Sequence, residues 1–331
     1  MTRVVLRADA GHALGFGHVA RMLALGDELA ARGVEVVPMF GGDAPAIEAW
    51  AAARGWQLRA RAWRDEDTRA AAARADAIVV DGLPALVGPG IMYADDGGLD
   101  LPAELVWNPN VHATGLVYTR PVRALLGRRY LVLGRAIRAA GRGACRPRTG
   151  RELRLAVTFG GSDPVNATAA ILCALPAGRA LVVDAIIGPG FRDASALAAA
   201  VRIARSAGHA VTVHRDPRDL PGLLARADAA VASAGGTLGE LAFLGCPALA
   251  FAIAPDQLEP ARAQAVFGLV AGGADWAALS GAELRTQLAD FLTDDAARAA
   301  LRTRALESAD GLGAARVADE LLAPAAARVA S

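Results

Sequence analysis

Short apolar runs alternate along the chain with longer segments in which apolar residues recur at helical spacing. Residues 3–6 form the first short run, and Val19, Met22, Leu23 and Leu29 then follow the period of a helix. The pattern predicts strands over residues 3–6, 34–40, 57–61, 76–80, 91–94, 104–107, 153–159, 181–187, 209–214, 229–232 and 247–253. It predicts helices from about 19 to 33 and over 45–54, 65–74, 165–175, 194–207 and 220–227, with a helical region from 280 onward. Strands that alternate with helices are typical of parallel sheets, so we expect an α/β fold.

The alternation is interrupted by residues 140–150, which are rich in Gly, Arg and Pro and have no periodicity. A chain of 331 residues is long enough for two domains. We therefore expect a first domain over 1–139, a linker over 140–150 and a second domain over 151–310. The helical segment 311–331 is expected to cross back onto the first domain.

Charge and cysteine content exclude several classes of partner. The net charge is +1, from 35 basic and 34 acidic residues, so nothing favours nucleic acid or an anionic membrane as a partner. Cys145, Cys173 and Cys246 have neither metal-ligand spacing nor a disulfide pattern. No secretory leader and no apolar stretch of about 18 residues is found, so we expect a cytoplasmic protein. The oligomeric state is left open, a monomer included.

A histidine stands at the first glycine-rich turn of the chain. Gly15 and Gly17 separate the first strand from the first helix, and His18 lies where that helix begins. The positive end of a helix disfavours imidazolium, so the ring there can stay neutral and accept a proton. His18 is therefore a candidate general base, although the pattern alone also fits a helix cap or a surface histidine.

Two further glycine-rich turns follow strands in the second half. One contains Gly160, Gly161 and Ser162, and the other runs from Ser233 to Glu240. Backbone N–H groups at such a turn, together with the helix dipole, suit a phosphate group. A carboxylate one helical turn in commonly accepts hydrogen bonds from ribose hydroxyls. The alternative is that these glycines only make tight turns and that Glu240 is a helix-terminal charge.

Acidic and amide side chains follow several strands of the first half, where ligands of parallel sheets bind. They are Asp81, the pair Asp95–Asp96, Asn108 and Asn110. Their spacing is not that of a calcium loop, so we expect turns or hydrogen bonds to sugar hydroxyls. We expect neither a metal nor a cofactor.

The motifs together resemble a known family over most of the chain. They are RADA…GFGHVAR, DGL, LLGRRYLVL, FGGSDPVNAT, SAGGTLGELAFLGCP and the DQ pair at 256–257, in family order. The chain resembles the UDP-2,4-diacetamido-2,4,6-trideoxy-β-L-altropyranose hydrolases of pseudaminic acid biosynthesis. The resemblance implies the GT-B architecture, in which two Rossmann-like domains with parallel sheets face an inter-domain cleft, and a metal-independent reaction.

The resemblance also implies roles for individual residues. His18 matches the catalytic base, and Glu240 matches the residue that binds the ribose hydroxyls. The other expected nucleotide contacts are Gly160, Gly161, Ser162, His214, Gly235, Gly236 and Thr237. The expected sugar contacts are Asp9, Gly15, Gly17, Arg21, Asp81, Asn108, Asp256 and Gln257.

Three positions depart from the family pattern. Relatives usually carry Asn at the position of Asp256, Arg at Gly134 and Ser at Gly236. A carboxylate at position 256 repels a phosphate and attracts a sugar amine or hydroxyl, so the sugar is left open. The expected activity is hydrolysis of a UDP-sugar at C1 with His18 activating water. The alternatives are a glycosyltransferase of the same fold, or an inactive sugar-nucleotide sensor.

Overall fold

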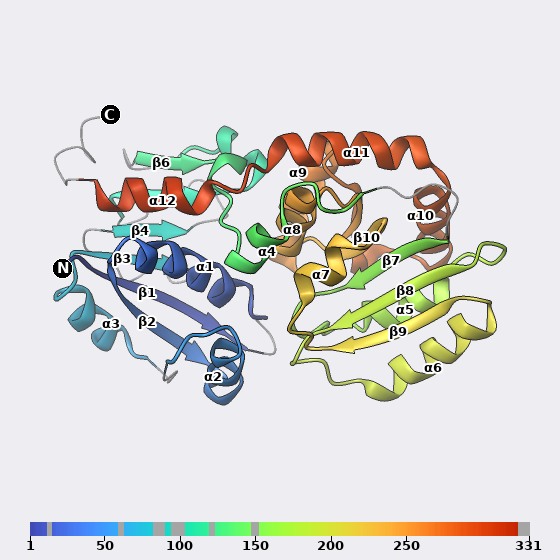
Figure 1. The fold of residues 1–331 in the computed structure, drawn as a ribbon, viewed down its shortest axis with the longest axis horizontal. Helices are drawn as coiled ribbons and strands as arrows, with labels where there is room; N and C mark the ends of the chain where they lie inside the picture. The colour runs from blue at the N-terminus through green and yellow to red at the C-terminus, as the bar shows by residue number, and fades with distance from the viewer. Residues whose placement is uncertain are drawn as a thin grey trace. The chain divides into compact units, whose positions relative to one another are not determined.

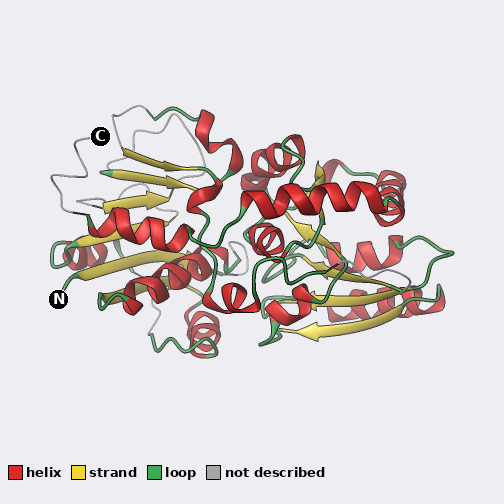
Figure 2. Cartoon of the chain, turned by 45° about the horizontal axis from the view of Figure 1, so that its top comes forward, coloured by secondary structure: helices red, strands yellow, loops and turns green. Residues whose placement is uncertain are grey.

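The structure, a computed structural model, describes residues 1–11, 15–58, 63–81, 90–93, 103–118, 123–146 and 152–323. The chain forms two compact units. The first is Met1–Arg135 together with Gly311–Ser331, and the second is Ala136–Asp310. Each unit contains one parallel sheet with helices packed against its strands (Figures 1 and 2). The α/β prediction is therefore confirmed.

The sheet of the first unit has six described strands in the order β2-β1-β3-β4-β5-β6. Its strands are β1 (Arg3–Ala10), β2 (Glu35–Gly42), β3 (Ala77–Asp81), β4 (Gly90–Tyr93), β5 (Leu105–Asn108) and β6 (Arg123–Leu126). Its helices are α1 (Gly17–Ala31), α2 (Ala44–Ala52), α3 (Asp65–Ala72) and α12 (Gly313–Leu322), with the 3-10 turns η1 (Val111–Gly115) and η2 (Arg128–Tyr130). Because β1 pairs with β2 on one side and β3 on the other, the turn after β1 begins beside the end of β3.

The C-terminal helix packs into the core of the first unit. Val317 and Leu321 of α12 are buried in the same cluster as Leu6 and Leu25. Gly313 allows this approach, because a Cβ there would lie 2.1 Å from the Leu131 carbonyl oxygen. Two ion pairs also hold α12 to this unit. Arg32 and Asp319 are 2.5 Å apart, and Arg123 and Glu320 are 2.8 Å apart.

The second unit has a six-stranded sheet in the order β12-β11-β10-β7-β8-β9. Its strands are β7 (Leu153–Thr158), β8 (Leu181–Ile187), β9 (Ala210–Arg215), β10 (Ala229–Ser233), β11 (Ala248–Ala252) and β12 (Ala271–Asp275). Its helices are α5 (Ala167–Ala174), α6 (Ala194–Ser206), α7 (Leu220–Ala225), α8 (Thr237–Leu244), α9 (Leu258–Val266), α10 (Gly281–Thr293) and α11 (Asp295–Ser308), with the 3-10 turns η3 (Pro255–Gln257) and η4 (Trp276–Ala278). β7 and β10 are neighbours, so the two glycine-rich turns of this unit leave adjacent strands at the same edge of the sheet.

Part of the expected linker is built into the second unit. Residues 135–140 form α4 (Arg135–Ala140), and the segment after it pairs with the end of α8. Gly143 N donates to Phe243 O and Cys145 N donates to Leu244 O, both at 2.9 Å. Backbone hydrogen bonds therefore hold residues to 146 against this unit, which begins at Ala136 and not at 151. Residues 147–150 lie outside the described residues.

Three other expectations differ from the structure. Residues 57–58 are not a strand, and the rest of the strand expected over 57–61 lies outside the described residues. β6 and β12 were not expected, because β6 is very short and β12 contains two glycines in five residues.

In the described part of the chain, no helix has both the length and the apolarity needed to cross a membrane.

Candidate functional site

His18 is the second residue of α1, and the turn before it is shaped by glycine. Gly15 has a φ of +70° and exchanges two backbone hydrogen bonds with Gly11, at 2.7 and 3.1 Å. An L side chain would strain this conformation. Gly17 begins the helix, and a Cβ on it would meet no atom within 4 Å. The open space around Gly17 exposes the start of α1, where backbone N–H groups point outward.

His18 belongs to a cluster with Asp81 and Arg21. The imidazole Nδ1 lies 2.8 Å from Asp81 Oδ1. Arg21, one helical turn further along α1, donates to Asp81 Oδ2 from Nε at 3.0 Å and from Nη2 at 2.8 Å. Asp81 is the last residue of β3, whose neighbour β1 leads into the His18 turn, so sheet topology brings the three side chains together. All three were expected to be site residues, and the structure places them in mutual contact.

The charge of Asp81 decides which nitrogen of His18 carries the proton. The Asp81 side chain is fully buried, and burial raises its pKa. The positive charge of Arg21 and the hydrogen bond from His18 outweigh burial, so the Asp81 pKa lies below its ordinary value. Asp81 is therefore an acceptor only, and Nδ1 of a neutral His18 must carry the hydrogen. Nε2 then has the lone pair, which is the arrangement of an oriented general base.

Two other predicted residues of the first unit, Asp9 and Asn108, have hydrogen-bond partners of their own. Asp9 lies in β1, where Arg7 binds its two carboxylate oxygens at 2.8 and 3.0 Å. Asn108 ends β5, is fully buried, and accepts a hydrogen bond from Asn110 N at 3.0 Å. The pair Asp95–Asp96 lies outside the described residues.

The first glycine-rich turn of the second unit, residues 160–166, connects β7 to α5. Gly160 has a φ of +77°, and Asp163 is held at +41°. The buried carboxylate of Asp163 accepts from Ala167 N at 2.8 Å and Thr168 N at 2.9 Å, which satisfies the start of α5. Ser162 is buried.

The loop after β8 supports this turn. A Cβ on Gly188 would lie 2.5 Å from Gly161 Cα, and one on Gly190 would lie 3.1 Å from Gly161 O. Gly190 N donates to the same carbonyl oxygen at 2.8 Å. Gly188 and Gly190 were not predicted as site residues, although the GPG sequence directly after a buried strand could have indicated a close backbone approach.

The second glycine-rich turn, residues 233–236, connects β10 to α8. Gly236 precedes α8, Thr237 is its first residue and Glu240 lies in its first turn. Gln257 reaches toward this turn from η3, because a Cβ on Gly235 would lie 3.8 Å from Gln257 Nε2. Its Oε1 accepts from Ile253 N at 3.1 Å.

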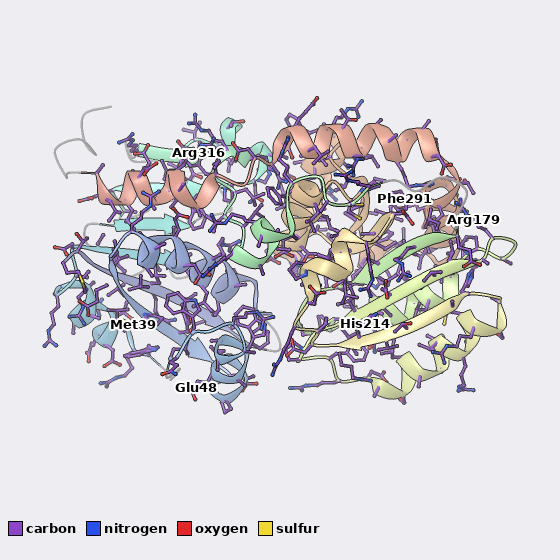
Figure 3. The ribbon with its side chains drawn as sticks, in the orientation of Figure 1. Met39, Glu48, Arg179, His214, Phe291 and Arg316 are labelled. Atoms are coloured by element: carbon purple, nitrogen blue, oxygen red, sulfur yellow. The ribbon has the colours of Figure 1, made fainter. Side chains whose placement is uncertain are left out.

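His214 belongs to a second cluster around a buried carboxylate. Its Nε2 lies 2.7 Å from Asp184 Oδ1, and Arg154 donates to Asp184 Oδ2 at 2.8 Å. Arg226 donates to Oδ1 at 3.3 Å. Burial raises the Asp184 pKa, but these hydrogen bonds and charges outweigh burial and lower it. His214 lies on β9, the edge strand (Figure 3). Asp184 was not predicted, although one carboxylate inside the apolar strand LVVDAII requires a partner.

The three departures from the family pattern occupy open positions. A Cβ on Gly134 or Gly236 would meet no atom within 4 Å, and neither has a positive φ. Gly236 has a φ of −55°, so a serine fits there without strain. Asp256 is exposed in η3.

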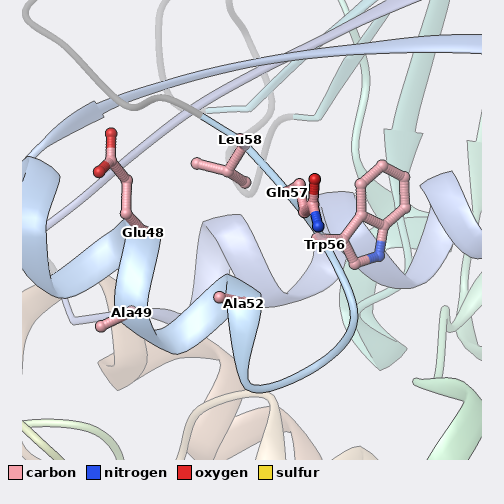
Figure 4. Close-up of a pocket in the computed structure, with 6 residues that line it drawn as sticks. All are labelled: Glu48, Ala49, Ala52, Trp56, Gln57 and Leu58. Carbon is pink, nitrogen blue, oxygen red and sulfur yellow. The ribbon is translucent and has the colours of Figure 1, made fainter.

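A hollow of about 510 Å³ lies on the first unit, between α2 and the segment that follows it. It is lined by Glu48, Ala49, Ala52, Trp56, Gln57 and Leu58 (Figure 4). Its lining contains neither His18 nor a residue of the glycine-rich turns, so it does not coincide with the predicted site. Among the described residues, no group of three or more His, Cys, Asp or Glu side chains could hold a metal ion.

Comparison with known proteins identifies the fold. No family model matches the chain, and no curated protein matches it. MurG of Acinetobacter baumannii is similar, with a TM-score of 0.67 at 15% identity over 97% of this chain and 99% of that chain. A UDP complex of S. aureus MnaA has a TM-score of 0.64 at 10% identity, over 97% and 96% of the two chains. The spinosyn rhamnosyltransferase SpnG, complexed with thymidine diphosphate, has a TM-score of 0.61 at 17% identity, over 96% and 99%.

These similarities cover nearly the whole of each chain. They confirm the predicted fold class, in which two Rossmann-like domains with parallel sheets form the GT-B fold.

Proposed function

We propose that the protein is a sugar-nucleotide hydrolase that cleaves a UDP-linked sugar at C1 and releases UDP and the free sugar. By resemblance to the pseudaminic acid enzymes, the sugar is a diacetamido-trideoxy hexose. In this proposal the second unit binds UDP and the first unit supplies the base. Neither a metal nor a cofactor takes part in it.

The observation that carries the proposal is the cluster of His18, Asp81 and Arg21. A neutral imidazole whose Nδ1–H donates to a buried carboxylate presents Nε2 as a base. Arg21 keeps that carboxylate ionised and donates two hydrogen bonds to Oδ2, so that Oδ1 faces His18. The same carboxylate stabilises the imidazolium that forms once His18 has taken a proton.

The reaction follows from these roles. His18 Nε2 takes a proton from water as the water oxygen bonds to C1 of the sugar. The bond between C1 and the UDP oxygen breaks, and its electron pair leaves with UDP. General-base help of this kind contributes about 10²–10⁴-fold to the rate.

The glycine-rich turns supply the binding side of the proposal. The turns 160–166 and 233–236 leave adjacent strands, and α5 and α8 begin directly after them. Backbone N–H groups at these helix starts stabilise the charge that develops on the departing diphosphate. The hydroxyl of Ser162, in the first of these turns, adds a donor. The UDP and thymidine diphosphate bound to two proteins of the same fold support a nucleoside diphosphate as the ligand.

A glycosyltransferase is the second candidate, because SpnG, of the same fold, is a rhamnosyltransferase. His18 would then deprotonate an acceptor hydroxyl instead of water. The sensor hypothesis assigns no role to the His18 cluster.

Nucleotide binding is tested by calorimetry with UDP and 2′-deoxy-UDP. If Glu240 binds the ribose hydroxyls, the wild type prefers UDP, and Glu240→Ala loses that preference. Equal discrimination by both proteins would make Glu240 a helix charge only. A panel of UDP-sugars without an acceptor then identifies the substrate by UDP release, and Asp256→Asn shifts that profile if Asp256 contacts the sugar.

A further inference from the structure

Asn166 closes the first glycine-rich turn of the second unit and links it to the loop after β8. It is the N-cap residue of α5, where an asparagine side chain usually accepts a hydrogen bond from the helix start. Asp163 takes that role here, since its carboxylate accepts from the N–H groups of Ala167 and Thr168. The amide of Asn166 instead donates from Nδ2 to Asp193 Oδ2 at 3.0 Å.

Both partners have a geometry that suits this link. Asn166 has a φ of +53°, a left-handed conformation that asparagine adopts more readily than most residues. Asp193 is the N-cap residue of α6, and its Oδ1 accepts from Ala196 N and from the Ser195 hydroxyl, both at 2.9 Å. Hydrogen bonds from these two groups and from the Asn166 amide lower the pKa of Asp193. One oxygen of an ionised carboxylate therefore caps a helix, and the other holds the turn.

The link is one of two attachments between the turn and the loop after β8. At the other attachment, Gly190 N donates to Gly161 O at 2.8 Å, and the backbone of Gly188 lies against Gly161. Residues 188–193 therefore contact both ends of the segment 161–166. A segment that is held at both ends keeps one conformation, whereas a segment that is held at one end can sample several.

We propose that Asn166 and Asp193 are positioning residues: their hydrogen bond holds the turn 160–166 in the shape that directs its backbone N–H groups at the substrate's diphosphate. The inference rests on the proposed function, because the diphosphate belongs to the sugar nucleotide. Neither side chain is a ligand in it, and the Asp193 carboxylate would repel a phosphate at close range. Donors that are already in place need no reorganisation when C1–O cleavage adds negative charge to the diphosphate.

Asn166→Gly removes the link and little else. Glycine adopts a φ of +53° without strain, and the substitution adds no charge. We expect the variant to bind UDP roughly 10-fold more weakly than the wild type in calorimetry, because a hydrogen bond to a charged group no longer orders the turn. Uridine, which has no phosphate, is expected to bind both proteins equally.

Exchanging the two side chains tests whether the hydrogen bond itself is responsible. In a double variant with Asn166→Asp and Asp193→Asn, the amide at position 193 donates to the carboxylate at position 166, and its oxygen still accepts from Ala196 N. Asn166→Asp alone places two carboxylates face to face. Asp193→Asn alone leaves one oxygen to accept from both Ala196 N and the Asn166 amide. We expect the double variant to bind UDP at least about 5-fold more tightly than the two single effects predict together.

A purely structural role gives a different result. Ser280→Ala is the matched control, since the Ser280 hydroxyl accepts from Glu283 N at 3.2 Å and caps α10 in the same unit. This variant is expected to have a lower Tm and an unchanged ratio of UDP to uridine affinity. An Asn166→Gly protein that behaves in the same way, or single effects that simply add in the double variant, would overturn the proposal.

Inorganic pyrophosphate distinguishes failure of this inference from failure of the proposed function. If the wild type binds pyrophosphate but not UDP, and Asn166→Gly weakens pyrophosphate binding, the positioning role stands and the nucleotide does not. If UDP binds the wild type and Asn166→Gly equally, the positioning role is wrong and the proposed function stands. If neither UDP nor pyrophosphate binds the wild type, both are overturned.

Discussion

Replacing Asp81 by Asn tests the link between a buried carboxylate and the proposed base. Asparagine has the same shape, but it has no charge and only one acceptor oxygen. In the wild type, Asp81 accepts one hydrogen bond from His18 and two from Arg21, all between 2.8 and 3.0 Å. The variant therefore leaves Arg21 without its counter-charge and allows His18 to adopt the tautomer in which Nε2 carries the hydrogen.

The size of the effect follows from burial. Breaking a fully buried ion pair costs about 3–5 kcal/mol. The side chains of Arg21 and His18 are 18% and 24% exposed, so water replaces part of what is lost. We expect roughly 2–3 kcal/mol in the free energy of unfolding, a Tm lower by about 4–12 °C, and turnover lower by about 10²–10⁴-fold.

The pH dependence of stability adds a second signature. The folded-state pKa of Asp81 is below its ordinary value, so the carboxylate contributes stability above that ordinary value. That stability is lost as the pH falls through the ordinary value toward the folded-state pKa. Asp81→Asn removes this contribution, so acid unfolding of the variant is less steep than that of the wild type.

Asp184→Asn is the matched control, because Asp184 is also a buried carboxylate between a histidine and arginines. Both variants are assayed at a temperature well below either Tm, by turnover at saturating substrate and by UDP calorimetry. Asp81→Asn loses turnover and keeps UDP affinity, whereas Asp184→Asn keeps turnover and loses UDP affinity. An Asp81→Asn protein that is destabilised as expected but turns over within about 3-fold of wild type would refute the reasoning.

Three further predictions concern single positions. Gly188→Ala places a Cβ 2.5 Å from Gly161 Cα, so we expect it to lower the affinity for UDP about 10-fold. Gly190→Ala is expected to lower this affinity less, and equal effects of the two variants in calorimetry would contradict the prediction. Burial lowers the pKa of His209, so the folded state binds fewer protons than the unfolded state, and stability falls as the pH drops below 6.5. In urea titrations, His209→Gln should make the free energy of unfolding depend less on pH in this range. Gly236→Ser should change the free energy of unfolding by less than about 0.5 kcal/mol.

Sequence patterns predict the fold best where strands are long and apolar. β8 occupies residues 181–187, as expected, because its run is apolar and bounded by polar turns. β12 was missed because Gly272 and Gly273 interrupt its apolar pattern, and only its pairing with β11 makes it a strand. Whether such a segment forms a strand depends on its contacts with the rest of the fold, and a local sequence pattern does not contain this information.

The candidate site was also predicted only in part. His18 and Asp81 were both expected at the carboxyl edge of the first sheet, but their direct contact depends on β1 and β3 being neighbours. The Asp184 cluster was missed because its partners come from β7, β9 and the end of α7. The role of Gly188 depends on the position of another backbone, Gly161, which no local motif predicts.

The central claim is that His18 activates water for attack at C1 of a UDP-linked sugar. The most direct test is one turnover experiment in ¹⁸O-labelled water without an acceptor, followed by mass spectrometry of the products, with His18→Asn as the control. The account predicts that the label is on C1 of the free sugar and none is on UDP. It also predicts that His18→Asn binds UDP like the wild type but turns over at least about 10²-fold more slowly. Label on the phosphate, or release of UDP only after a hydroxyl acceptor is added, would contradict it.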